Sequence, residues 1–171
     1  MQSDLERVLF DEPAIRRRLD EMAAQISNDY RDRELTMIAI LTGSLIFVAD
    51  LLRRIPLPLK LDCLSVVSYH GKTQTSGEVI FKQVALPDLV GRDVLILDDI
   101  LDSGHTLAAI REKLQAAKPC SVRVCVLLSK KNNAPGMSMQ IMLSSKLKMN
   151  LSSVTGSISW SAIATCLTSA R

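Results

Sequence analysis

Apolar residues follow two different periods along this chain. In three segments they recur every three or four positions, which is the spacing of one face of an amphipathic helix. The first of these segments begins at Asp11-Glu12-Pro13, where acids and a proline are typical of a helix start. The first predicted helix starts at residue 11 and continues to at least residue 26. The other two cover residues 45–55 and 107–117.

Elsewhere apolar residues form short continuous runs, as the buried strands of a parallel sheet do. The run at residues 94–97 is followed directly by Asp98 and Asp99, so we expect this strand to end before the two acids. Strands that alternate with helices predict an α/β fold, a doubly wound and mostly parallel sheet flanked by helices, with an antiparallel excursion around residues 59–84. The predicted strands cover residues 35–41, 59–68, 78–84, 94–97 and 121–128.

Composition narrows the class of protein. A length of 171 residues, with 47% hydrophobic and 23% charged residues, suits one globular domain with a sizeable core. The net charge of +3 is too small and too dispersed to favour a nucleic-acid partner. The charged N-terminus has no apolar signal core, and no apolar run reaches membrane-spanning length, so we expect a cytoplasmic protein without a membrane partner. Cys63 and Cys125 lie in apolar strand segments, which predicts buried free thiols.

The segment after residue 97 carries the candidate chemistry. Asp98 and Asp99 precede the turn Asp102-Ser103-Gly104-His105-Thr106, which opens onto a predicted helix. A glycine-containing turn at a helix N-terminus presents backbone N–H groups to an anion, and ligands of open α/β sheets bind beyond the carboxyl ends of the strands. Acids beside a phosphate would bind sugar hydroxyls, a divalent cation or a proton in transit. The alternative is an ordinary strand–turn–helix capped by either of the first two residues of the turn.

This run resembles the phosphoribosyl-pyrophosphate loop of the type I phosphoribosyltransferases, specifically their hypoxanthine-guanine branch. The resemblance implies purine salvage, in which phosphoribosyl pyrophosphate gives its 5-phosphoribosyl group to N9 of a 6-oxopurine base, with Mg²⁺ as cofactor. It also implies a homo-oligomer, a dimer or a tetramer. In the family's pattern Asp98 and Asp99 would hold the ribose hydroxyls and the metal, and Asp102 would act as general base or acid at the purine N7. The residues that would hold the 5′-phosphate are Ser103, Gly104, His105 and Thr106.

A second segment, Leu41-Thr42-Gly43-Ser44, resembles the family's pyrophosphate loop. There, backbone amides at a strand-to-helix turn hold the leaving group, so Thr42 and Gly43 would face the pyrophosphate. Family members often carry Lys in place of Thr42. The alternative is an ordinary turn in which Ser44 caps the following helix.

Two more sites resemble parts of this family. The polar segment 68–77 opens with Ser68 and Tyr69, which match a Ser-Tyr pair at the start of the loop that closes over the reacting centre. A surface hairpin loop is the alternative. Lys130 follows an apolar strand, where the family places a lysine that donates to the exocyclic oxygen of the purine.

The chain changes character after Lys131. No Asp or Glu follows Glu112, and residues 132–171 are rich in serine and methionine without a clear period. If the last base of each codon is combined with the first two bases of the next, residues 154–169 can encode YGLDFMERYRNLPDI, which resembles the family's C-terminal region. We therefore divide the chain into a phosphoribosyltransferase domain, residues 1–131, and an aberrant tail, residues 132–171. A base deleted near the codons for residues 130–133 would make this tail a frame-shifted and poorly ordered segment.

Two other classes of function stay open from the sequence. One is a non-catalytic relative on the same fold that senses nucleotides or binds RNA, which would need a basic face. The other is an inactive truncated product, which the tail alone suggests. Preference among hypoxanthine, guanine and xanthine is also open, because base selectivity in this family lies largely in the altered region.

Overall fold

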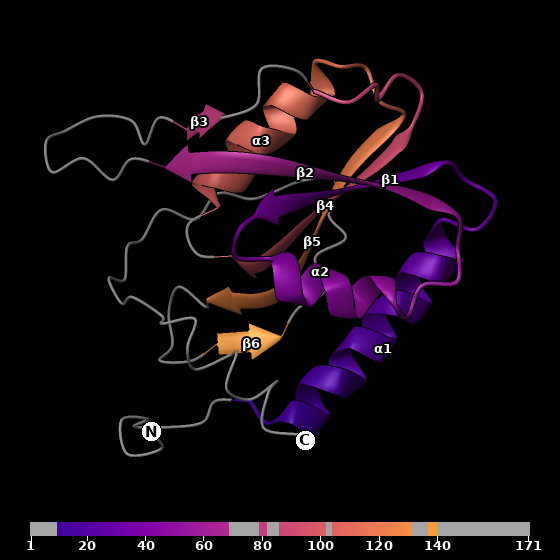
Figure 1. Cartoon of the computed structure of the whole chain (residues 1–171), viewed down its shortest axis with the longest axis vertical. Coiled ribbons are helices and arrows are strands. Elements are labelled where there is room, and N and C mark those ends of the chain that lie inside the picture. The colour runs from indigo at the N-terminus through magenta and orange to yellow at the C-terminus, as the bar shows by residue number, and fades with distance from the viewer. Residues whose placement is uncertain (1–9, 69–78, 82–85, 102–103, 131–136, 140–171) are drawn as a thin grey trace, which may run out of the picture.

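The computed structural model describes residues 10–68, 79–81, 86–101, 104–130 and 137–139. Its strands are β1 (Leu35–Leu41), β2 (Leu59–Ser68), β3 (Val79–Phe81), β4 (Asp93–Leu101), β5 (Ser121–Lys130) and β6 (Met137–Met139). They form one sheet in the order β3-β2-β1-β4-β5-β6 (Figure 1). The four central strands are parallel, whereas β3 and β6 run antiparallel to β2 and β5. The predicted α/β fold, including the antiparallel excursion, is confirmed.

Within the described residues, three helices cover the two faces of the sheet: α1 (Glu12–Asp29), α2 (Leu45–Leu52) and α3 (His105–Gln115). Helices α1 and α2 lie together on one face and α3 lies on the other (Figure 1). Helix α1 begins as predicted, because the Asp11 side chain accepts a hydrogen bond from the Ala14 amide at 2.8 Å and a proline occupies the first turn.

The core is divided by the sheet into two clusters, and β1 contributes to both. Its residues Leu35, Met37 and Ala39 pack toward α1 and α2, and Ile38 and Ile40 pack toward α3. A central strand with helices on both sides needs apolar residues at consecutive positions. This requirement explains why the strand is recognisable in the sequence as a continuous apolar run.

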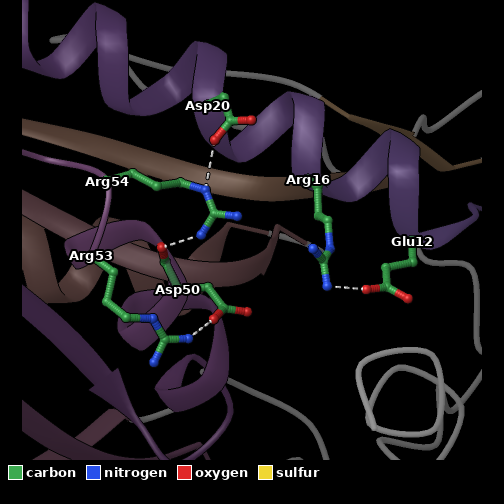
Figure 2. A network of polar contacts seen from close by, with 6 residues as sticks. All are labelled: Glu12, Arg16, Asp20, Asp50, Arg53 and Arg54. Atoms are coloured by element: carbon green, nitrogen blue, oxygen red, sulfur yellow. Dashed lines mark hydrogen bonds and ion pairs between the residues drawn. The ribbon is translucent and has the colours of Figure 1, made fainter. Parts of the chain in front are cut away.

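Polar contacts join α1 to the C-terminal end of α2 (Figure 2). The Arg54 guanidinium donates through Nε to the Asp20 carboxylate and through Nη1 to the backbone oxygen of Asp50, both at 2.7 Å. Arg53 forms an ion pair with the Asp50 carboxylate. The Asp20 carboxylate is largely exposed, so the ion pair between Arg54 and Asp20 contributes at most about 1 kcal/mol to the stability of the fold. The contacts therefore orient α2 more than they stabilise the fold.

Strand β4 departs from the sequence prediction. It continues to Leu101, so Asp98 and Asp99 lie within the strand and do not follow it. The reason is tertiary, because β5 pairs with β4 as far as Leu101: Asp98 lies opposite Val126 and Ile100 opposite Leu128, whereas Asp99 has no partner in this register. The prediction that the strand ends at residue 97 is wrong, although the pairing of β4 with β1 does end there.

Smaller differences follow from local structure. Helix α2 ends at Leu52, three residues before the predicted end, and α3 begins at His105. Cys125 is buried as predicted, whereas Cys63 is only half-buried. Strand β6 was not predicted and lies within residues 132–171, while residues 140–171 of the predicted tail lie outside the described residues. Among the helices that the structure describes, none has the length and apolar character needed to cross a membrane.

Candidate active site

The order of the strands defines one edge of the sheet as the candidate site. From β1 the chain passes to β2 on one side, and it later returns to β4 on the other side of β1. Strands β1 and β4 pair in parallel, from Leu35 opposite Asp93 to Ala39 opposite Leu97. Their carboxyl ends are therefore neighbours at the point where the strand order reverses, which is where open α/β sheets bind ligands.

Two carboxyl groups lie where β4 extends beyond its pairing with β1. Asp99 is 8% exposed, and its amide donates to Oδ1 of Asp98 at 3.2 Å. The regular alternation of the strand changes here, because Leu97 and Ile100 both pack against the cluster under α1 and α2. This irregularity lets neighbouring side chains, which point to opposite faces of an ideal strand, interact with each other.

The electrostatics of this acid pair are set by burial. Burial, and next the negative charge of Asp99, raise the pKa of Asp98 to about 8. Burial likewise raises the pKa of Asp99. Two buried carboxyls in contact do not both ionise readily, so near neutral pH the pair retains a proton unless a cation or a hydrogen-bond donor compensates its charge.

The acid pair fits a magnesium ion by the chemistry of its donors. Magnesium is commonly bound through one or two carboxylates, with substrate phosphates and water completing its shell. Within the described ranges, no group of three or more His, Cys, Asp or Glu side chains gathers around a single point. An ion at Asp98 and Asp99 would therefore take its further ligands from outside this described set, oxygen atoms of substrate and water among them.

The beginning of α3 has the form of an anion site. Gly104 occupies the N-cap position with φ of 79°, a left-handed conformation that glycine adopts without strain. No described side chain caps this helix and its first turn has no acid, in contrast to α1 with its Asp11 cap. His105 is exposed and Thr106 is half-buried at this positive end of the helix. Capping by Asp102 or Ser103 is not what the structure has, since Gly104 is the N-cap; Asp102 and Ser103 lie outside the described residues.

The turn after β1 has an outward and an inward side. Thr42 is exposed, Gly43 is half-buried, and the peptide bond between Leu41 and Thr42 is cis. Ser44 is fully buried, and its hydroxyl donates to the backbone oxygen of Ile40 at 2.6 Å. It occupies the N-cap position of α2 but makes no capping hydrogen bond. The interpretation of Ser44 as a helix cap is therefore wrong.

The backbones of two other predicted site residues lie at the same edge of the sheet. Ser68 is the last residue of β2 and Lys130 is the last residue of β5, and both strands run parallel to β1 and β4. Tyr69 and the polar segment that follows it lie outside the described residues. The described part of the predicted site is thus gathered at the carboxyl ends of four neighbouring parallel strands.

Comparison with known proteins identifies the family. The sequence pattern of the phosphoribosyl transferase domain matches residues 8–147. The chain belongs to the phosphoribosyltransferase family. A hypoxanthine-guanine phosphoribosyltransferase of Staphylococcus epidermidis is 43% identical over 132 residues, which is 77% of this chain and 74% of that protein.

Solved structures of phosphoribosyltransferases have the same fold. A hypoxanthine phosphoribosyltransferase from Staphylococcus aureus superimposes with a TM-score of 0.73 at 38% identity, covering 82% of this chain and 76% of its own. The Trypanosoma cruzi enzyme in complex with the product IMP has a TM-score of 0.65 at 32% identity, covering 73% and 71%. All site residues predicted from the sequence lie inside the matched domain. Sequence reasoning missed the inward hydrogen bond of Ser44, for which a small polar residue in a turn is no specific signal.

Proposed function

We propose that this phosphoribosyltransferase acts in purine salvage. It would transfer the 5-phosphoribosyl group of phosphoribosyl pyrophosphate to N9 of hypoxanthine or guanine, giving IMP or GMP and pyrophosphate. The observation that carries the proposal is the meeting of an acid pair, a helix start that no described side chain caps and a strand-to-helix turn at one topological switch point. The names of its relatives agree with it, since those proteins are hypoxanthine-guanine phosphoribosyltransferases.

The start of α3 would bind the 5′-phosphate. Its first-turn amides and the helix dipole favour an anion, and the Thr106 hydroxyl adds a donor. Ser103 and His105 would complete this phosphate site from the two sides of Gly104. The absence of an acid from the first turn supports the proposal, because an acid there would repel the ligand.

The acid pair would bind the sugar. Asp98 and Asp99 would accept hydrogen bonds from the ribose hydroxyls and hold Mg²⁺ directly or through water. When bound, magnesium neutralises charge on the departing pyrophosphate. Asp102, a short distance along the chain, would hold or move a proton at N7 of the purine, a role typically worth about 10²–10⁴-fold in rate.

The remaining strand ends would enclose the leaving group and the base. The backbone amides of Thr42 and Gly43 would hold the pyrophosphate. Ser68 and Tyr69 would belong to a segment that covers the reacting centre and excludes water. The Lys130 ammonium would donate to the 6-oxygen of the base, which selects 6-oxopurines over adenine.

We further propose that residues 132–171 are read in a shifted frame in this sequence. The alternative frame supplies acids that the written tail lacks, and an aromatic residue suited to stack on the purine. Sequencing the gene across the codons for residues 129–135 should find one additional base. If the sequence is confirmed as written, this part of the proposal is wrong and the chain lacks much of the family's base site.

The experiment that tests the function compares three proteins with phosphoribosyl pyrophosphate, Mg²⁺ and each purine base. The frame-restored protein should form IMP and GMP but no AMP, and the 171-residue chain should be weakly active or inactive. Asp102→Asn in the frame-restored protein should lower kcat by about 10²–10⁴-fold while phosphoribosyl pyrophosphate still binds. Failure of the frame-restored protein to make either nucleotide would contradict the proposed reaction.

The alternative of an RNA-binding relative is not favoured, because the relatives at 40–43% identity are hypoxanthine-guanine phosphoribosyltransferases and the net charge is only +3. A cytoplasmic location and assembly into a dimer or tetramer stay predictions. Size-exclusion chromatography with light scattering would measure the assembly.

A further inference from the structure

We propose that Ser44 is a positioning residue for the pyrophosphate leaving group. Its hydroxyl would not touch the substrate, but would hold the turn that presents Thr42 and Gly43 at the edge of the sheet. This inference rests on the proposed function and adds to it a residue that sets the affinity for one part of the substrate.

The first observation is a gap in the pairing of β1. Its pairing with β2 continues to Leu41 opposite Ser65, but its pairing with β4 stops at Ala39 opposite Leu97. The last two residues of β1 therefore lack the neighbour on one side that the rest of the strand has. A buried backbone group in such a place needs another hydrogen-bond partner.

Ser44 supplies that partner to the carbonyl of Ile40. Its hydroxyl donates to the Ile40 oxygen at 2.6 Å, and its amide donates to the same oxygen at 3.4 Å. The side chain is completely buried, so this hydroxyl is directed into the protein and not toward a ligand. Two hydrogen bonds from one residue close the chain back onto the end of the strand.

The turn that results is hydrogen-bonded to α2 and is exposed to solvent at Thr42. The Leu45 amide donates to the Thr42 oxygen at 3.3 Å, and the Val48 amide donates to the Ser44 oxygen at 2.8 Å. These bonds tie the carbonyls of the turn to α2, while Thr42 is exposed. A serine at the N-cap position usually bonds to an amide of the first helical turn. Here the Ser44 hydroxyl donates to the end of β1 instead, so it does not cap the first-turn amides of α2.

The physical consequence is selective. Without the hydroxyl, the Ile40 carbonyl loses the shorter of its two bonds from Ser44, and the turn is held less firmly in its position. Ligands that contain pyrophosphate should lose affinity, whereas a ligand bound only at α3 and the acid pair should not. A general loss of stability would weaken both ligands alike.

The test is calorimetric titration of the full chain and its variants with Mg²⁺ and one of two ligands, phosphoribosyl pyrophosphate or ribose 5-phosphate. Ser44→Ala removes one oxygen atom and should weaken phosphoribosyl pyrophosphate by about tenfold, with ribose 5-phosphate unchanged. Ser44→Thr keeps the hydroxyl and should retain the ratio of the two affinities. Ser27→Ala is the matched control, because the Ser27 hydroxyl on α1 is buried without a partner among the described residues.

The outcomes separate the two levels of the proposal. If the unsubstituted chain binds phosphoribosyl pyrophosphate and Ser44→Ala binds it equally well, or loses both ligands equally, the positioning role is wrong. If Ser44→Ala does not fold, Ser44→Thr decides: a retained ratio of the two affinities supports the role, and a selective loss of affinity for phosphoribosyl pyrophosphate, although the hydroxyl is kept, refutes it. If neither the 171-residue chain nor the frame-restored protein binds either ligand, the proposed function fails, and this inference fails with it.

Discussion

Replacing Asp98 by asparagine is expected to stabilise the ligand-free protein at pH 8 while removing part of its proposed metal and sugar site. The wild-type side chain is mostly buried next to Asp99, and both conditions favour its protonated form. Asparagine has nearly the same shape and no charge to lose or gain. The substitution therefore removes the cost of ionising a carboxyl in this position.

The sign follows from the direction of the shift. The pKa of Asp98 is raised in the folded chain from an ordinary value near 4 to about 8. Stability that depends on the protonated carboxyl is fully present below about pH 4 and is lost as the pH rises toward 8. Asp98→Asn should thus have little effect at pH 4 to 5 and an increasing stabilising effect toward pH 8.

The magnitude is smaller than the shift alone suggests. A shift of this size on one isolated group corresponds to about 5 kcal/mol. The proton is shared with Asp99, and solvent reaches part of Asp98, so we expect a gain of about 2 kcal/mol at pH 8. For a chain of this length that gain raises Tm by roughly 4–8 °C.

Thermal unfolding in the absence of metal, at pH 5 and at pH 8, measures the effect. Asp88→Asn is the control, because Asp88 is an exposed carboxylate away from the acid pair. Adding Mg²⁺ and phosphoribosyl pyrophosphate should raise Tm of the wild type more than that of Asp98→Asn. The same difference in Tm at both pH values, or a lower Tm of Asp98→Asn at pH 8, would refute the reasoning.

Two further predictions concern buried groups away from the site. Burial raises the pKa of Tyr30 to about 12, so stability that is present below about pH 10 should be lost between pH 10 and 12. Tyr30→Phe should remove that loss. At pH 7 the variant should be at least as stable as the wild type, because the Tyr30 hydroxyl has no partner among the described residues. Circular dichroism followed from pH 7 to pH 12 measures the two effects, and an unchanged loss of stability in the variant would contradict the assignment to Tyr30. Burial also raises the pKa of the Cys125 thiol to about 12, whereas Cys120 is exposed. A thiol reagent at pH 8 should therefore label Cys120 rapidly and Cys125 only on unfolding, which peptide mapping by mass spectrometry would check; early labelling of Cys125 would be the contrary result.

The central strands could be predicted from the sequence because their burial on both faces leaves a continuous apolar run. The bounds of β1 and β2 agree with the prediction at both ends. The end of β4 could not be predicted, because Asp98, Ile100 and Leu101 belong to the strand through pairing with β5. Strand β6 has three residues and no alternation to detect, and it exists through its pairing with β5.

The candidate site shows the same division between local and tertiary information. Gly104 and the acids are recognisable because each chemical role needs a particular residue type at a particular spacing. The contact between Asp98 and Asp99 is not recognisable, because neighbours in a regular strand point apart. The inward hydroxyl of Ser44 depends on where the pairing of two strands ends, which no local pattern records.

The pairing of β1 with β4 has a consequence for the order in which the protein folds. It joins Leu35 to Asp93, so a long loop containing α2, β2 and β3 must close before the two halves of the site meet. Closing such a loop costs entropy that only later contacts compensate, which makes parallel pairings of this kind slow to form. Binding of phosphoribosyl pyrophosphate should therefore appear late in refolding, after helix content has recovered, and would report completion of the sheet.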